Sequence, residues 1–111
     1  HGVPYVTTKE ALYGFTRHLA TEVAQHGITV NAILPGFIVT PKLAAHWPQE
    51  RIEKLGPTIP ALRAGTPEEV ASLVVYLASP EAGYLTGAAI PIDGAVSIVP
   101  GGRMDPENCW V

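Results

Sequence analysis

Residues 27–36 read GITVNAILPG, and this stretch sets the fold class that the sequence predicts. From residue 28 to residue 34 the side chains are largely β-branched and almost continuously apolar, which is typical of a β-strand buried on both faces. Pro35 and Gly36 end the strand, and a helical pattern reaches it through one glycine, Gly27. A helix joined to a buried strand by so short a connection is typical of an α/β fold.

The segment before this strand, residues 7–26, has the pattern of an amphipathic helix. Its apolar side chains recur at three- and four-residue steps: Leu12, Phe15, Leu19 and Val23. Pro4 suits the start of a helix, and Gly27 suits a C-terminal cap in the left-handed conformation. Small residues between the apolar ones would let another helix approach closely. We therefore predict a helix over 7–26.

Two further elements are predicted downstream. Thr66-Pro67 begins a helix, because threonine is a good N-cap, proline fits the first helical position, and Glu69 completes a capping box. This helix buries an apolar stripe and ends at Ser79-Pro80; the stripe comprises Val70, Leu73, Val74 and Leu77. Residues 88–92 form a second short strand closed by a turn at Asp93. Between the two strands, residues 41–65 are irregular except for a short helix over 49–55, and residues 97–111 have no regular structure.

The predicted order is helix, strand, irregular segment, helix, strand. Two strands alone do not make a stable sheet in water, and a strand buried on both faces needs neighbours. The sequence is therefore expected to be part of a larger α/β layer structure, incomplete as a domain. It begins at His1 without a methionine, so we expect a fragment, a processed product or an incompletely represented chain.

Composition excludes several classes of function. The 111 residues are 47% hydrophobic and 15% charged, with a formal net charge of -3. The low charged fraction predicts more burial than usual. The mild negative charge without basic runs argues against nucleic-acid and anionic-membrane partners. The single cysteine cannot form an internal disulfide, and no apolar run is long enough to cross a bilayer, so we expect a cytoplasmic protein.

Tyr5 and Lys9 lie four residues apart near the start of the first helix, a spacing that places both side chains on one face. A phenol ordinarily has a pKa of about 10, and a neighbouring ammonium favours the phenolate, so such a pair can exchange a proton with an alcohol or carbonyl oxygen. The alternative is that the tyrosine packs and the lysine is solvated. The spacing alone leaves both open.

The surrounding motifs resemble the short-chain dehydrogenase/reductase family. In order, they are Tyr-x-x-x-Lys at residues 5–9, GITVNAILPGFIVT at 27–40, GTPEEVASLVVYLAS at 65–79 and YLTGAAIPIDG at 84–94. The resemblance is to the group that includes 3-oxoacyl-carrier-protein reductases and many sugar and alcohol dehydrogenases. It implies that residues 1–96 are the C-terminal portion of a Rossmann-type, doubly wound parallel sheet, followed by the tail.

The resemblance also assigns roles to the pair on the first helix. Tyr5 matches the family's catalytic acid/base. Lys9 matches the lysine that promotes ionisation of that tyrosine and binds the nicotinamide ribose. The implied cofactor is NAD or NADP, and the implied substrate is a small alcohol or carbonyl compound.

The loop after the first strand matches the family's cofactor-binding loop. Pro35 and Gly36 match the Pro-Gly pair beside the nicotinamide, although Pro-Gly alone also marks a plain turn. Ile38 matches the position whose backbone holds the carboxamide, and Thr40 matches the hydroxyl that contacts the cofactor near its phosphates. A loop at the carboxyl end of a parallel strand is where α/β sheets bind ligands. The resemblance also assigns a substrate lid to Leu43, Trp47, Ile52 and Leu55.

Other polar residues carry simpler predictions. The four histidines, which lack metal-ligand spacing, are expected to serve surface or packing roles: His1, His18, His26 and His46. Glu68 and Glu69 are expected to stabilise a helix start. Asp93 is expected to support a turn, in which Ala95 departs from the family's usual Asp-Gly-Gly.

The family's Gly-rich pyrophosphate turn has no counterpart in this sequence, and its catalytic serine and asparagine would precede His1. Two functional hypotheses follow. In the first, the chain is the C-terminal portion of an NAD(P)-dependent oxidoreductase, inactive alone and completed by an N-terminal portion. In the second, it is a truncated, catalytically inactive relative that serves as an interaction module. Helix 7–26 would then mediate homo-oligomerisation, a role this helix commonly has in the family.

Overall fold

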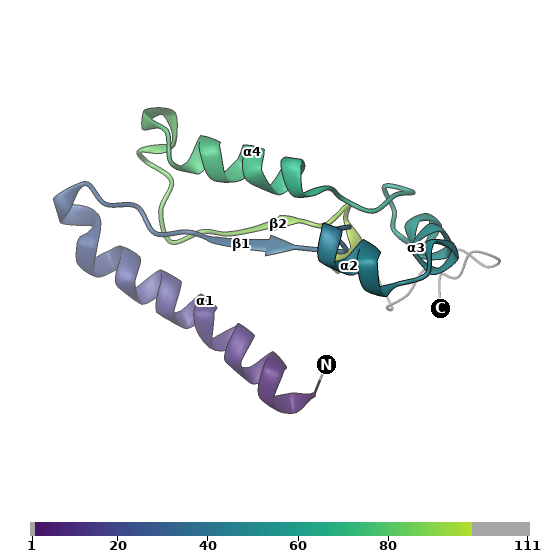
Figure 1. Ribbon diagram of the computed structural model, residues 1–111. Helices are drawn as coiled ribbons and strands as arrows, with labels where there is room; N and C mark the ends of the chain where they lie inside the picture. Colours follow the sequence, from purple (N-terminus) through teal and green to yellow (C-terminus); the bar gives the residue numbers. More distant parts are fainter. Residues whose placement is uncertain (1, 99–111) are drawn as a thin grey trace. The chain divides into compact units, whose positions relative to one another are not determined.

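The computed structural model describes residues 2–98. Its labelled helices and strands, shown in Figure 1, are α1 (Val3–Val23), β1 (Ala32–Pro35), α2 (Pro41–His46), α3 (Gln49–Leu55), α4 (Pro67–Leu77) and β2 (Ala89–Ile92). Within the described residues the chain forms two compact units. The first unit comprises residues 2–33 and 73–90, and the second comprises residues 34–72 and 91–98.

Helix α1 begins four residues before the predicted start at Thr7. Pro4 lies within its first turn, where a missing N–H costs nothing, so it starts the helix from inside rather than preceding it. The amides of Tyr5 and Val6 donate to the carbonyl of Gly2 (3.1 and 3.2 Å). At the other end a short 3-10 turn leads to Gly27, whose φ of 71° confirms the predicted left-handed cap.

Small side chains make the closest contacts of α1 within the first unit. Thr16 and Ala20 are buried, and a Cβ added to Gly87 would lie 3.5 Å from the Cβ of Ala20. Leu12 and Phe15, two members of the predicted apolar stripe, are instead 48% and 61% exposed. The other two members of the stripe, Leu19 and Val23, are half-buried, so the stripe is buried only toward the C-terminal end of the helix.

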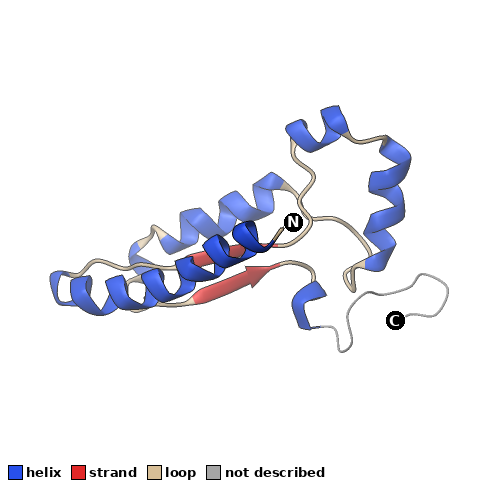
Figure 2. Cartoon of the chain, turned by 90° about the horizontal axis from the view of Figure 1, so that it is seen from below, coloured by secondary structure: helices blue, strands red, loops and turns tan. Residues whose placement is uncertain are grey.

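Strands β1 and β2 form a two-stranded parallel sheet, drawn as neighbouring red arrows in Figure 2. The amide of Ala32 donates to the carbonyl of Ala88 (2.8 Å), and the amide of Gly36 donates to that of Ile92 (3.1 Å). Both bonds join residues 56 positions apart in the sequence, which shows that the strands run in the same direction. The predicted α/β class is confirmed.

The first strand begins later than predicted, at Ala32 rather than residue 28, because side-chain bonds replace part of the backbone pairing before it. One backbone bond remains there, from the amide of Gly87 to the carbonyl of Val30 (2.7 Å). The amide of Val30 donates to the Thr86 hydroxyl (3.0 Å). The Asn31 amide group donates to the carbonyl of Leu85 (2.8 Å) and accepts from the amide of Ala88 (3.1 Å). The two segments therefore stay joined through Thr86 and Asn31 where a regular ladder is absent.

The prediction of a strand buried on both faces is wrong for the described residues. Strand β1 is half-buried until its exposed last residue, and β2 alternates between exposed and half-buried positions. Each strand has one partner strand within residues 2–98, so the described sheet leaves an unpaired edge on each. The expectation of unusually high burial fails with it, since the buried apolar side chains are Ala20, Ile52, Ile59 and Ala82.

The second unit contains an α-helix that the sequence analysis did not predict. Helix α2 begins after Thr40, whose side chain accepts from the amide of Leu43 (3.1 Å), and Pro41 occupies its first turn. The predicted helix α3 is confirmed with the same bounds. Between α2 and α3, the ring of Trp47 lies 5.9 Å from that of Phe37, centroid to centroid.

Helix α4 and its capping box are confirmed. The amide of Glu69 donates to the Thr66 hydroxyl (3.3 Å), and a Glu69 carboxylate oxygen accepts from the amide of Thr66 (2.9 Å). The predicted stripe is half-buried at Val70 and Leu73, whereas Val74 is 49% exposed.

The start of the predicted irregular tail is structured. A short 3-10 helix covers Val96–Ile98, and residues 99–111, which include Cys109, lie outside the described part of the chain. A domain boundary at residue 96 stays a prediction. None of the helices within residues 2–98 is long and apolar enough to cross a membrane. The same residues contain no cluster of three or more histidine, cysteine or acidic side chains that could hold a metal ion.

Candidate active site

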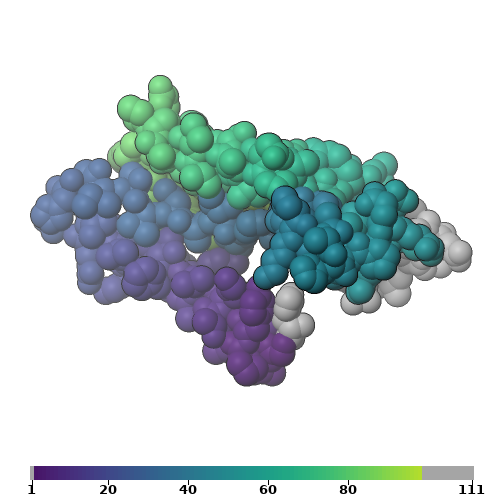
Figure 3. Space-filling model, viewed as in Figure 1, coloured from purple at the N-terminus to yellow at the C-terminus, as the bar shows by residue number. Residues whose placement is uncertain are grey.

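Tyr5 and Lys9 face each other on the first two turns of α1. The Lys9 ammonium lies 5.7 Å from the centroid of the Tyr5 ring, within the range of a cation–π interaction. Tyr5 is 49% exposed, and Figure 3 shows the N-terminal turns of α1, coloured purple, at the surface of the molecule. The helix thus brings a phenol and an ammonium together where a small molecule can reach them.

The loop of residues 35–40 leaves the carboxyl end of β1 and lies in the second unit. Gly36 approaches the backbone of Asp93 so closely that an added Cβ would lie 2.7 Å from the Asp93 Cα. Since its φ is not positive, Gly36 is required here for close approach rather than for a left-handed turn. The plain-turn interpretation of Pro35-Gly36 therefore misses the packing that a glycine makes possible.

Ile38 pairs with Gly65 in an isolated parallel bridge. The bonds run from the amide of Gly65 to the carbonyl of Phe37 (2.9 Å) and from the amide of Val39 to the carbonyl of Gly65 (3.0 Å). Because main-chain polar groups alternate along an extended chain, the N–H and C=O of Ile38 itself point away from Gly65. The bridge to Gly65 therefore leaves the N–H donor and the C=O acceptor of Ile38 on the same side of the chain.

Thr40 ends the loop as the N-cap of α2. Its oxygen accepts from the amide of Leu43, while its hydroxyl hydrogen remains a donor for another acceptor.

The turn after β2 contacts the same loop. The Asp93 carboxylate accepts from the amide of Ala95 and from that of Ser97, both at 2.9 Å, which confirms its predicted role in a turn. Hydrogen bonds from Ser97, first of all, and from Ala95 hold the pKa of Asp93 below its usual value. Ala95 itself adopts a φ of 73°, a left-handed conformation that favours the glycine usual in the family.

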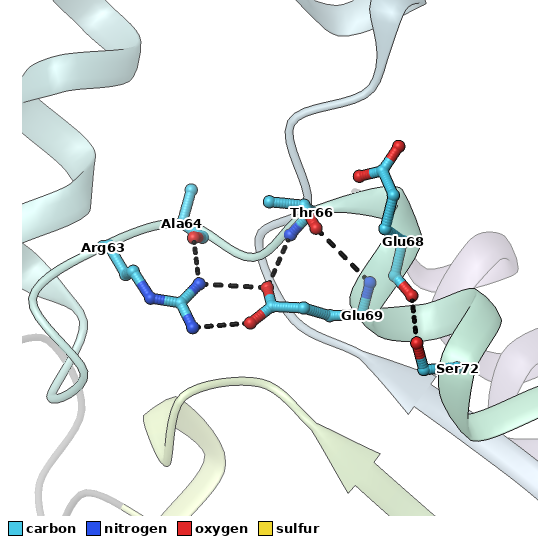
Figure 4. Close-up of polar contacts among 6 residues, drawn as sticks. All are labelled: Arg63, Ala64, Thr66, Glu68, Glu69 and Ser72. Carbon is cyan, nitrogen blue, oxygen red and sulfur yellow. Dashed lines mark hydrogen bonds and ion pairs between the residues drawn. The ribbon is translucent and has the colours of Figure 1, made fainter. Parts of the chain in front are cut away.

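Sequence reasoning did not identify Arg63. Its guanidinium forms two bonds with the Glu69 carboxylate, at 2.5 and 3.0 Å, and donates to the carbonyl of Ala64 at 3.0 Å (Figure 4). The bonds from Arg63, and then the bond from the amide of Thr66, lower the pKa of Glu69 to about 2. Arg63 lies in the connection before α4, and Glu69 lies six residues later in the first turn of that helix, so no periodic pattern links the two.

The predicted lid segment borders a cavity of about 720 Å³ in the second unit. Leu55, one of the predicted lid residues, lines it together with Thr58 and the cationic residues Arg51 and Lys54. Lys54 forms an ion pair with Glu50 (2.7 Å), and the guanidinium of Arg51 lies 3.9 Å from the Trp47 ring. Ile52 is 9% exposed and belongs to the core of the unit.

The predicted site residues fall into two groups. Tyr5 and Lys9 come together in the first unit, and the structure brings together the remaining four in the second: Pro35, Gly36, Ile38 and Thr40. Their catalytic and cofactor-binding roles stay predictions.

Comparison with known proteins identifies the family. A family model described as enoyl-(acyl carrier protein) reductase matches residues 1–97. The short-chain reductase protein NovJ of Streptomyces niveus is 46% identical over 81% of this chain, and 3-oxoacyl-(acyl-carrier-protein) reductase FabG of Vibrio harveyi is 44% identical over 86%. The chain spans 37% and 38% of the lengths of these two relatives.

Solved structures agree with this assignment. The crystal structure of YwfH, an NADPH-dependent reductase involved in bacilysin biosynthesis, matches with a TM-score of 0.68 and 37% identity. The match covers 77% of this chain and 36% of YwfH. The α/β arrangement described above thus corresponds to part of a Rossmann-type fold. This chain belongs to the short-chain dehydrogenase/reductase family.

Proposed function

We propose that the chain supplies the acid/base pair and the carboxamide-binding loop of an NAD(P)-dependent oxidoreductase that interconverts a carbonyl compound and an alcohol. The observation that carries this proposal is the pairing of Tyr5 with Lys9 on α1, with the ammonium 5.7 Å from the ring centroid. The pair occurs in a chain whose relatives include 3-oxoacyl-(acyl-carrier-protein) reductases.

A bound nicotinamide cofactor supplies the hydride for reduction or accepts it in oxidation. In the reductive direction, the phenol of Tyr5 donates its proton to the carbonyl oxygen as hydride reaches the carbonyl carbon, which gives the alcohol. The Lys9 ammonium stabilises the negative charge left on the phenolate oxygen. In the oxidative direction the phenolate accepts the alcohol proton.

The loop after β1 fits the amide end of such a cofactor. The N–H and C=O of Ile38, which the bridge to Gly65 does not use, match the acceptor and donor of a carboxamide. The Thr40 hydroxyl can donate to an anionic oxygen while its own oxygen caps α2. These groups are the basis for proposing NAD or NADP as the cofactor.

Replacement of one hydroxyl tests the catalytic role. In the protein that carries this chain, we expect Tyr5→Phe to lower kcat for NAD(P)H-dependent reduction of a 3-oxoacyl thioester by about 10²- to 10⁴-fold, the contribution of a positioned acid. Tyr13→Phe removes a hydroxyl from the same helix and is the matched control, expected to retain activity. Equal activity of Tyr5→Phe and wild type would contradict the proposal.

Cofactor binding provides a separate test. We expect the 111-residue chain alone to give little enhancement of NADH or NADPH fluorescence, because the Gly-rich turn that binds pyrophosphate in this family is absent from the sequence. Tight binding by the chain alone would show that it carries more of the cofactor site than we propose.

A second candidate function, self-association, is favoured by the exposed apolar residues of α1. Val6, Leu12 and Phe15 are 50%, 48% and 61% exposed. We expect the chain to form homo-oligomers through this helix, and Leu12→Glu to shift the sedimentation profile to monomer. A wild-type chain that sediments as a monomer at high concentration would contradict this candidate. A cytoplasmic location accords with both proposed functions and stays a prediction.

A further inference from the structure

Gly65 holds the loop of residues 37–39 through two peptide groups. The peptide between Ala64 and Gly65 donates its N–H to the carbonyl of Phe37, and the peptide between Gly65 and Thr66 accepts from the amide of Val39. Gly65 also packs so closely on Ile38 that an added Cβ would lie 2.6 Å from the Ile38 Cδ1. The orientation of these two peptides therefore fixes the orientation of the Ile38 backbone.

The opposite edges of the same two peptides are bound by Arg63 and Glu69 (Figure 4). The guanidinium of Arg63 donates to the carbonyl of Ala64 at 3.0 Å. The carboxylate of Glu69 accepts from the amide of Thr66 at 2.9 Å. Each peptide beside Gly65 thus has one polar group bound to the Arg63–Glu69 pair and the other bound to loop 37–39.

The two charged side chains are themselves fixed by each other. Their two parallel bonds form the fork that arginine makes with a carboxylate, which constrains direction as well as distance. The bonds from Arg63 favour the ionised carboxylate of Glu69, whose pKa is lowered to about 2. The side chains are 60% and 38% exposed, so solvent screens their attraction and the geometry matters more than the charge.

We infer that Arg63 and Glu69 are positioning residues that hold the peptides beside Gly65 and thereby orient the backbone N–H and C=O of Ile38 toward the nicotinamide carboxamide. The inference rests on the proposed function for the identity of the ligand. The restraint that the pair places on the Ile38 backbone concerns residues of this chain alone. Neither side chain is assigned contact with the cofactor.

Amide hydrogen exchange in the protein that carries this chain, measured without cofactor, tests whether the pair restrains the Ile38 backbone. We expect Arg63→Met and Glu69→Gln to raise the exchange rates of the Val39 and Gly65 amides about two- to fivefold, the range for loss of an exposed ion pair. Arg63→Lys, which keeps the charge but loses the fork, should give an intermediate rate. Glu50→Gln breaks a comparable exposed pair with Lys54 and should leave both amides unchanged.

Ligand affinity tests the consequence in the protein that carries this chain. We expect Arg63→Met and Glu69→Gln to raise the Kd for NADH or NADPH about two- to fivefold. The factor equals that expected for amide exchange, because molecules in which the loop has opened also lose the carboxamide contact. The Kd for ADP-ribose, which lacks the nicotinamide, should stay at the wild-type value. A general loss of structure would weaken both ligands alike.

Three outcomes would overturn the inference: unchanged exchange in both variants, an equal effect of Glu50→Gln, or equal weakening of ADP-ribose and NAD(P)H. If the wild-type protein binds neither nucleotide, the proposed function fails, and the exchange rates alone then decide whether the Arg63–Glu69 pair orients Ile38.

Discussion

Replacing Gly36 with alanine should destabilise the protein, because the new methyl group has no room. The added Cβ would lie 2.7 Å from both the Cα and the Cβ of Asp93, and 3.1 Å from its carbonyl oxygen. Ordinary carbon–carbon contact begins at about 3.5 Å, so the Asp93 backbone must withdraw by about 0.8 Å, the difference between 3.5 and 2.7. Overpacking of this kind costs about 1–3 kcal/mol.

Two smaller effects modify that cost. Withdrawal of Asp93 strains the bond from the Gly36 amide to the neighbouring Ile92 carbonyl, at 3.1 Å, whose loss would cost about 0.5–1.5 kcal/mol. The lower entropy of an unfolded alanine returns about 0.4–1 kcal/mol. The central values give a net loss of about 2 kcal/mol in the free energy of unfolding.

Urea unfolding followed by far-UV circular dichroism measures this loss. Gly14→Ala is the matched control, because Gly14 lies within α1 and an added Cβ meets nothing within 4 Å. Alanine should there stabilise the helix by about 1 kcal/mol. The reasoning is refuted if Gly36→Ala is as stable as wild type while Gly14→Ala shows its expected gain.

Three further substitutions or conditions test the remaining contacts. Ala95→Gly should raise the free energy of unfolding by about 0.5 kcal/mol, because relief of the left-handed strain at φ 73° exceeds the entropy cost of glycine; a loss in urea unfolding would contradict this. Thr66→Ala should lower it by about 1 kcal/mol through loss of the α4 cap, and an unchanged urea midpoint would contradict the capping role. The pKa of Glu69 is lowered from 4.5 to about 2, so its native bonds stabilise the fold above about pH 4.5 and lose that effect as pH falls toward 2. The pKa of Asp93 is also lowered, so its bonds are likewise weakened in acid. Unfolding measured from pH 2 to 5 should therefore show a shallower pH dependence in Glu69→Gln than in wild type, and parallel curves would refute the assignment.

Local signals account for what the sequence predicted correctly. Thr66, Pro67 and Glu69 specify the start of α4 through contacts three residues apart, and the structure contains both bonds of the capping box. Thr40-Pro41 carries the same threonine–proline signal and would have revealed α2. The signal is weaker there, because Leu43 rather than an acidic residue stands three positions after the threonine and α2 therefore lacks the second bond of a capping box.

Contacts between distant segments could not be predicted. Gly36 and Asp93 are far apart in the sequence, and nothing in Pro-Gly distinguishes a turn from a site of close backbone approach. The spacing of Tyr5 and Lys9 predicted that they would face each other, which the cation–π contact confirms. It gave no information on how far each is exposed, since burial depends on the segments that pack against a helix.

Loop 36–40 is placed chiefly by backbone contacts, and this determines which of its residues can vary. Gly36 and Gly65 contact their neighbours because they lack side chains, and the bridge to Gly65 uses main-chain atoms of residues 37 and 39. The groups proposed to bind the carboxamide are likewise the main-chain N–H and C=O of Ile38. The proposed contact therefore does not require the isoleucine side chain. Substitutions that keep an extended backbone at residue 38 should therefore preserve the site. A side chain added at Gly36 or Gly65 should displace the backbone of this loop. Both glycines thus matter for the position of the loop, although neither has a side chain that could contact a ligand.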